Sequence, residues 1–140
     1  MLKNLPETLT PELFAILAEM GHGDELVIAD ANYPARANAK RLYVNKAMDS
    51  LQMLDLVTKY LPLDTFVACP AALMAVVPGD DYVPDLWPQY LEIIRRNERE
   101  IEVEYLERQA FYARGREAFA VIATGERGRY GNIILKKGIV

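Results

Sequence analysis

The only histidine of the chain, His22, lies between two glycines, directly after a helical pattern and before an apolar run that ends at Asp30. An imidazole has an ordinary pKa of about 6.5, so it can donate and accept a proton near neutral pH. Glycine on both sides lets the backbone come close to a ligand. A carboxylate where a strand gives way to a loop is a frequent active-site position on α/β scaffolds. His22 is therefore a candidate acid–base group, with a capping or solvent-facing histidine as the alternative.

Two later segments carry polar groups that suit the recognition of hydroxyl groups. The polar turn between two apolar runs near the C-terminus contains Tyr130, Gly131 and Asn132. A hairpin turn with a packing tyrosine is the structural alternative for this segment. Arg108 lies on a predicted helix, where a surface salt bridge is the alternative role. Neither segment identifies a ligand by itself.

Several common mechanisms lack their sequence signatures. The chain has no phosphate-binding Gly-x-x-x-x-Gly-Lys-Ser/Thr loop and no dinucleotide-binding glycine fingerprint. A zinc site or a serine or cysteine triad would have to use His22, and no nucleophile-elbow sequence is present. The acid pair Asp80 and Asp81 is interpreted as a solvated turn rather than a metal site. Acid–base chemistry by one imidazole remains, assisted by carboxylates, tyrosines or backbone groups.

The composition excludes some classes of partner and location. The chain has 140 residues and a formal net charge of −4 at pH 7, whereas a nucleic-acid or anionic-membrane partner requires a basic surface. The one cysteine, Cys69, excludes an intrachain disulfide and is interpreted as a buried core thiol. No signal-peptide pattern and no apolar run of about 18 residues is present. We therefore expect a soluble cytoplasmic protein with a single domain over residues 1–140.

The hydrophobic pattern supplies the elements that would position the candidate groups. A first helix is predicted to begin after Thr10 as its N-cap and to end at Gly21 in a left-handed conformation. Further helices are predicted at 46–60, 84–97 and 107–117, and strands at 26–29, 42–44, 66–69, 73–77, 118–123 and 132–135. Residues 32–38 are predicted to be a loop, and residues 95–104 a charged connector. This alternation predicts a three-layer α/β/α domain with helices on both faces of a central sheet, and it leaves the strand order open.

Taken together in their order, the motifs resemble one family. Met-Gly-His-Gly-Asp-Glu is followed by Asp-Ala-Asn-Tyr-Pro-Ala, then Arg-x-Ala-Phe-Tyr, then Thr-Gly-Glu-Arg-x-x-Tyr-Gly-Asn-Ile-Ile-Leu-Lys-Lys-Gly. This set closely resembles the L-fucose mutarotase and D-ribose pyranase family and covers essentially the whole chain. The opening Met-Leu-Lys-Asn, the Pro-Glu-Leu helix start and the Lys-Lys-Gly ending favour the fucose branch.

The resemblance implies a role for each candidate residue. His22 becomes the proton donor and Tyr130 a second catalytic residue, while Asp30, Arg108 and the Tyr130-Gly131-Asn132 segment bind the sugar. It further implies a reaction without metal or organic cofactor. Members of the family form closed, ring-like homo-oligomers, often decamers, with active sites shared between subunits. The C-terminal tyrosine segment of one subunit is then expected to approach the His22 pocket of its neighbour.

The function implied is a mutarotase that interconverts the α and β anomers of a free monosaccharide, most simply L-fucose. A D-ribose pyranase is the nearest alternative, because ring opening is common to both reactions. A sugar-binding regulator without turnover and a purely structural ring are alternatives from other classes. Mere binding or assembly does not need a proton donor, so the presence of His22 together with Tyr130 and Asn132 favours an enzyme.

Overall fold

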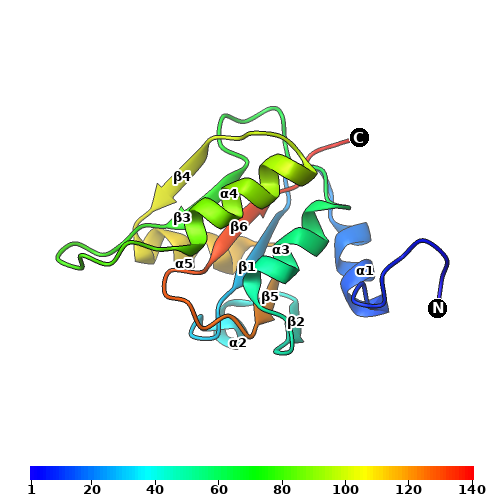
Figure 1. The fold of residues 1–140 in the computed structure, drawn as a ribbon, viewed down its shortest axis with the longest axis horizontal. Helices are drawn as coiled ribbons and strands as arrows, with labels where there is room; N and C mark the ends of the chain where they lie inside the picture. The colour runs from blue at the N-terminus through cyan, green and yellow to red at the C-terminus, as the bar shows by residue number, and fades with distance from the viewer.

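The computed structural model describes residues 1–140, with five helices and six strands. In chain order the elements are α1 (Pro11–Glu19), β1 (Glu25–Ala29), α2 (Ala35–Asn38), β2 (Leu42–Asn45), α3 (Ser50–Thr58), β3 (Ala71–Met74), α4 (Leu86–Asn97), β4 (Val103–Leu106), α5 (Arg108–Glu117), β5 (Ala120–Thr124) and β6 (Ile133–Lys136). The strands form one sheet in the order β2-β5-β1-β6-β3-β4 (Figure 1).

One strand, β6, runs against all the others. It pairs antiparallel with its two neighbours, β1 and β3. The remaining pairs, β1 with β5, β2 with β5 and β3 with β4, are parallel. The carboxyl ends of five strands therefore lie at the same edge of the sheet as the amino end of β6. In open α/β sheets, ligands bind in crevices at this edge.

Apolar side chains cover both faces of the sheet. Along β1, Leu26 and Ile28 belong to the larger core and Val27 and Ala29 to the smaller one, as the two-residue period of a strand requires. The larger core includes residues of α1, α3 and α4, and the smaller core includes residues of α2 and α5. Figure 1 shows α3 and α4 in front of the sheet and α5 behind it. The predicted three-layer α/β/α fold is confirmed.

Capping residues define the ends of several helices. Thr10 Oγ1 accepts a hydrogen bond from Leu13 N at 3.3 Å, which confirms the predicted start of α1. The Glu107 carboxylate caps α5 by accepting hydrogen bonds from two backbone amides of the first turn.

None of the five helices combines the length and the hydropathy that crossing a bilayer requires.

The predicted end of α1 and start of α3 are wrong. The first helix ends at Glu19 with an extended residue, and the left-handed backbone conformation occurs at Gly23 (φ 86°) rather than at Gly21. The third helix begins at Ser50 instead of residue 46, because Asp49 forms a capping box with Gln52. The polar turn before it is fixed by this cap, which the apolar period alone does not reveal.

Three further segments differ from their predictions. Residues 66–69 form no strand, and β3 occupies only residues 71–74 of the apolar stretch. The predicted loop 32–38 contains the single turn of α2 after Pro34. The charged connector leads into an unpredicted strand, β4, which lies at the edge of the sheet with one neighbour. An edge strand keeps solvated charged residues, so its sequence lacks the apolar run of a central strand.

Asp55 of α3 is hydrogen-bonded to α4, the neighbouring helix on the larger core. Its carboxylate accepts hydrogen bonds from Lys59, the C-cap residue of α3, at 2.6 Å, and from Arg96 and Asn97 of α4, each at 2.9 Å. The Lys59 hydrogen bond is the main cause that lowers the pKa of Asp55 to about 2, against the opposing effect of burial. This carboxylate is therefore ionised at any pH above its unfolded-state value of 3.8.

We expect Asp55→Ala to lower the free energy of unfolding at pH 7 by about 1 kcal/mol, measured by urea denaturation. The folded-state pKa lies below the unfolded one, so the stabilisation is present above about pH 4 and lost as the pH falls toward 2. The control is Glu92→Gln, which removes an exposed ion pair within α4 and should change the free energy of unfolding much less than Asp55→Ala does. Equal effects of the two substitutions would contradict the proposed link between the helices.

Candidate active site

A hollow of about 290 Å³ opens at the carboxyl edge of the sheet. Four segments contribute to it: the loop after β1, the segment after β3, the first turns of α5 and the turn before β6. Its lining residues are Asp30, Asn32, Tyr33, Met74, Val77, Asp80, Arg108, Tyr112, Arg129, Tyr130 and Asn132. Polar and aromatic groups from distant parts of the chain therefore converge where the topology predicts a ligand.

Asp30 is a buried carboxylate at the end of β1, with 5% of the residue exposed. Its Oδ1 accepts hydrogen bonds from the backbone amides of Asn32 at 2.9 Å and Tyr33 at 3.0 Å, and its Oδ2 accepts one from Gly131 N at 3.3 Å. Burial raises the pKa of Asp30, and the backbone hydrogen bonds partly offset this effect. The Oδ2 atom, which has only the long Gly131 contact, retains capacity to accept from a ligand hydroxyl.

Asn132, immediately before β6, is locked against the end of β1. Its Oδ1 accepts a hydrogen bond from Asp30 N at 2.7 Å, and 2% of the residue is exposed. The backbone N–H of Asp30 can only donate, so the atom of the Asn132 side-chain amide that it contacts must be the oxygen. The Nδ2 group is then directed away from Asp30 and is free to donate to a ligand.

Tyr130 adopts a left-handed backbone conformation (φ 57°), which is uncommon for an aromatic residue. Its carbonyl oxygen accepts a hydrogen bond from Trp87 Nε1 at 3.0 Å. Its hydroxyl donates to Asp80 Oδ2 at 2.7 Å. Contacts at both ends of the residue therefore hold it in this conformation at the hollow.

The first turns of α5 contribute Arg108 and Tyr112. These residues are four positions apart and so lie on the same face of the helix. Both line the hollow, and the Arg108 guanidinium forms no ion pair within the chain. The guanidinium offers hydrogen-bond donors and the tyrosine adds an aromatic surface, a combination suited to a polyhydroxylated ligand with C–H faces.

A buried polar network supports the turn before β6. The Glu126 carboxylate accepts hydrogen bonds from Ser50 Oγ at 2.7 Å and from Gly128 N at 2.7 Å. Tyr90, which is fully buried, places its hydroxyl 2.5 Å from Ser50 Oγ and 2.7 Å from the Gly131 carbonyl oxygen. Burial opposes ionisation of Glu126, but the hydrogen bonds lower its pKa below the ordinary value. The network connects α3 and α4 to the backbone of the site.

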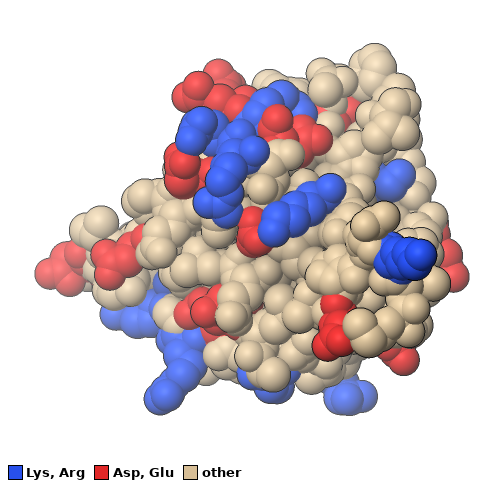
Figure 2. All heavy atoms as spheres, turned by 45° about the vertical axis from the view of Figure 1, so that its right-hand side comes forward, with Lys and Arg blue, Asp and Glu red and all other residues tan.

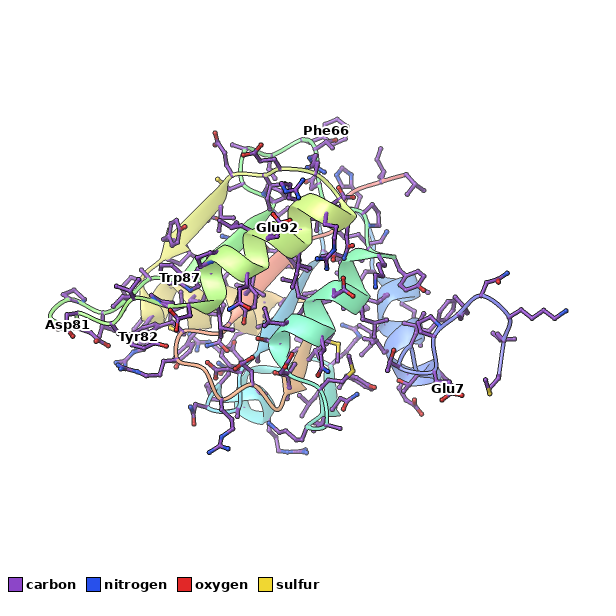
Figure 3. All side chains as sticks on the ribbon, in the orientation of Figure 1. Glu7, Phe66, Asp81, Tyr82, Trp87 and Glu92 are labelled. Atoms are coloured by element: carbon purple, nitrogen blue, oxygen red, sulfur yellow. The ribbon has the colours of Figure 1, made fainter.

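His22 lies at the opposite edge of the sheet, before β1 begins. Its Nε2 is 3.1 Å from Asp64 Oδ1, and its ring contacts Phe66 with centroids 5.4 Å apart. The imidazole side chain is 44% exposed, and Phe66 projects from the same edge (Figure 3). The five residues of β1 separate this edge from Asp30 by about 17 Å at 3.3 Å per residue.

Asp64 gives His22 a defined orientation. The Phe66 backbone amide is the main cause that lowers the pKa of Asp64, so the carboxylate is ionised and can only accept a hydrogen bond. His22 Nε2 therefore carries a proton, and Nδ1 is the atom free to exchange a proton with a ligand.

The structure thus brings together most of the residues expected from the sequence. Asp30, Arg108, Tyr130 and Asn132 line one hollow, and Gly131 contributes its backbone amide to Asp30. His22 does not join them within one chain. No three His, Cys, Asp or Glu side chains converge as a metal-binding cluster.

Sequence reasoning missed Tyr112, Asp64 and Asp80 as site residues. Tyr112 has a local signal, since it lies one helical turn after Arg108 in the Arg-x-Ala-Phe-Tyr motif. The two acids have none, because the His22–Asp64 and Tyr130–Asp80 contacts join residues 42 and 50 positions apart.

Comparison with known proteins supports the resemblance. Residues 3–140 match the RbsD / FucU transport protein family. The chain is 45% identical to the fucose mutarotase of Homo sapiens, covering 99% of this chain and 94% of that protein. It is 41% identical to the L-fucose mutarotase of Actinobacillus pleuropneumoniae, covering 99% and 97%.

Solved structures agree with the sequence comparison. The crystal structure of the fucose mutarotase from Streptococcus pneumoniae in complex with L-fucose superposes with a TM-score of 0.92 at 42% identity, covering 99% of both chains. Bacillus subtilis RbsD complexed with D-ribose gives a TM-score of 0.74 at 26% identity, covering 100% of this chain and 99% of RbsD. The chain belongs to the RbsD/FucU family.

Proposed function

We propose that this protein is a cofactor-independent mutarotase, an isomerase that interconverts the α and β anomers of free L-fucose. The observation that carries the proposal is the convergence of Asp30, Arg108, Tyr130 and Asn132 on one hollow. The fucose-bound relative, with 42% identity and nearly complete coverage, supports the choice of sugar. We propose that residues 1–140 act as one mutarotase domain in the cytoplasm, where a free thiol such as Cys69 is usual.

The reaction requires two coordinated proton transfers. Opening the ring removes a proton from the anomeric hydroxyl and delivers one to the ring oxygen, and closing on the other carbonyl face reverses both steps. His22 Nδ1, in the imidazolium that Asp64 stabilises, is suited to deliver the proton to the ring oxygen and to take it back on closing, while the anomeric proton passes to the oxygen acceptors on the other side of the site. In the hollow, on the other side of the bound sugar, Tyr130 and Asp30 present oxygen atoms to the sugar hydroxyls.

His22 and the hollow lie at opposite edges of the sheet, so both can act on one sugar only if two chains share the site. The edge that carries His22 must then contact the opposite edge of a neighbouring chain. Such a contact joins two different surfaces and is satisfied throughout only in a closed ring. We therefore propose a ring-like homo-oligomer, with a decamer as the form that the family resemblance implies.

The surface is compatible with such an assembly. Phe66, in contact with His22, is 72% exposed, and Ile139, after β6, is 59% exposed. Val83, after β3, and Tyr105, in β4, are 78% and 51% exposed. Figure 2 shows areas free of charged side chains between clusters of mixed charge. Exposed apolar side chains at both edges favour burial against a partner.

A D-ribose pyranase is the second candidate, supported by the ribose-bound RbsD of the same family. Its lower identity of 26% places it behind the fucose proposal. A sugar-binding regulator without turnover is the third, and it differs in having no need for a proton donor.

Saturation-transfer NMR tests the function directly. We expect the protein to increase the exchange rate between the α and β signals of L-fucose well above the rate in buffer. D-ribose should exchange more slowly, and galactose and glucose serve as specificity controls. Treatment with a chelator should leave the rate unchanged. Buffer-like exchange for every sugar in the panel would reject the enzymatic proposal.

The pair formed by His22 and Asp64 is tested by substitution. We expect His22→Ala to lower L-fucose exchange by about 10²-fold or more, because general acid–base catalysis supplies gains of that order. Asp64→Asn should cause a smaller loss, since it keeps the imidazole and removes only the partner that orients it. Size-exclusion chromatography should show unchanged assembly for His22→Ala, because the turn at Gly21-His22-Gly23 needs no imidazole to form. Wild-type rates in His22→Ala would remove this residue from the mechanism.

Subunit sharing is tested by complementation between two inactive variants. His22→Ala and Tyr130→Ala chains are unfolded, mixed in equal amounts and refolded. With random assembly, about a quarter of the shared sites receive both intact residues, so activity should reappear above that of either variant refolded alone. A verified mixed oligomer without recovered activity would show that the two residues do not act in one shared site.

A further inference from the structure

The loop between β3 and α4 lines part of the hollow through Val77 and Asp80 and contacts Tyr130. Figure 3 shows Asp81 and Tyr82 on this loop, where it projects beyond the body of the molecule. The preceding residue, Asp80, receives three hydrogen bonds: from Tyr130 Oη at 2.7 Å and Arg129 at 2.5 Å, both to Oδ2, and from Tyr82 N at 3.0 Å to Oδ1. Both oxygens of this one carboxylate are therefore engaged.

The same loop also fixes the plane of the Tyr130 ring. The Tyr82 ring stacks against it, with centroids 6.0 Å apart and planes inclined by 27°. The Arg129 guanidinium lies 4.6 Å from the Tyr82 ring centroid and 5.7 Å from that of Tyr130. Val77 N donates to the Tyr130 hydroxyl at 3.4 Å. The tyrosine is thus held at its ring face and at its hydroxyl.

We propose that Asp80 is a positioning residue of the reaction, which fixes the Tyr130 hydroxyl so that its oxygen accepts a hydrogen bond from the sugar. This inference rests on the proposed mutarotase function. An ionised carboxylate can only accept, so the single proton of the phenol is committed to Asp80. The phenolic oxygen then has no proton of its own to donate, and beside the long contact from Val77 N it keeps one acceptor position for a ligand.

The direction of this hydrogen bond suits the chemistry. The Tyr130 hydrogen bond is the main cause that lowers the pKa of Asp80, so the carboxylate remains ionised at neutral pH. A charged acceptor polarises the phenol and strengthens the next hydrogen bond in the chain. The anomeric hydroxyl must lose a proton for the ring to open, and an aligned, polarised acceptor assists that step. A tyrosine free to rotate would instead alternate between donor and acceptor.

Asp80→Asn tests the proposal, because an amide of nearly the same shape can donate to the Tyr130 oxygen and reverse the hydrogen bond. We expect it to lower kcat for L-fucose at least tenfold, with a smaller change in KM. Asp80→Glu, which restores a carboxylate, should recover part of the loss. The matched control is Asp81→Asn, an exposed neighbouring acid outside the hollow, which should retain kcat within about twofold.

A double-mutant cycle with Tyr130→Phe shows whether Asp80 acts through the tyrosine. In the Tyr130→Phe background, Asp80→Asn should lower kcat by no more than about twofold, because the hydroxyl it positions is already absent. Circular dichroism and size-exclusion chromatography verify the fold and assembly of every variant. Fully multiplicative losses in an active protein would overturn the role of Asp80 alone. An inactive wild-type protein would overturn the proposed function and this role with it.

Discussion

The reversed direction of β6 is the constraint on which the candidate site depends. This strand lies between β1 and β3 and runs against both, so the turn before it arrives where they end. The hydrogen bond from Asp30 N to Asn132 Oδ1 closes that junction, and the Gly131 amide reinforces it. A parallel strand in this place would put the same turn at the other edge of the sheet. The direction of β6 therefore brings Asp30, Asn132 and Tyr130 to one hollow.

Buried polar contacts then make the junction rigid. Glu126, Ser50 and Tyr90 link the backbone of the site to two helices of the larger core, and no buried side-chain polar atom lacks a partner. Satisfied networks of this kind hold groups in place more firmly than loop packing alone. A site that exchanges protons with small sugars benefits from such preorganisation, because the catalytic groups need not reorganise at each turnover.

Local signals were sufficient for most of the fold and for part of the site. The cap at Thr10 marked the start of α1, and the groups at strand ends, such as Asp30 and Asn132, could be named because they adjoin apolar runs. The failures at β4 and at Asp80 share a physical cause, since each depends on a distant partner. The strand β4 exists through pairing with β3 alone, and Asp80 became part of the site only through a tyrosine 50 residues away.

The left-handed backbone at Tyr130 has a consequence for how this chain can change. A non-glycine residue in that region costs about 1–3 kcal/mol, so glycine there would relieve this backbone cost but would also remove the phenol and its contacts with Asp80 and Tyr82. The chain therefore carries a local backbone cost at the position of the proposed catalytic side chain. Relief of the backbone cost would favour glycine at this position, whereas the contacts of the phenol and the proposed turnover would oppose it. At residue 130, an unstrained backbone and a phenol in the hollow therefore cannot be obtained together.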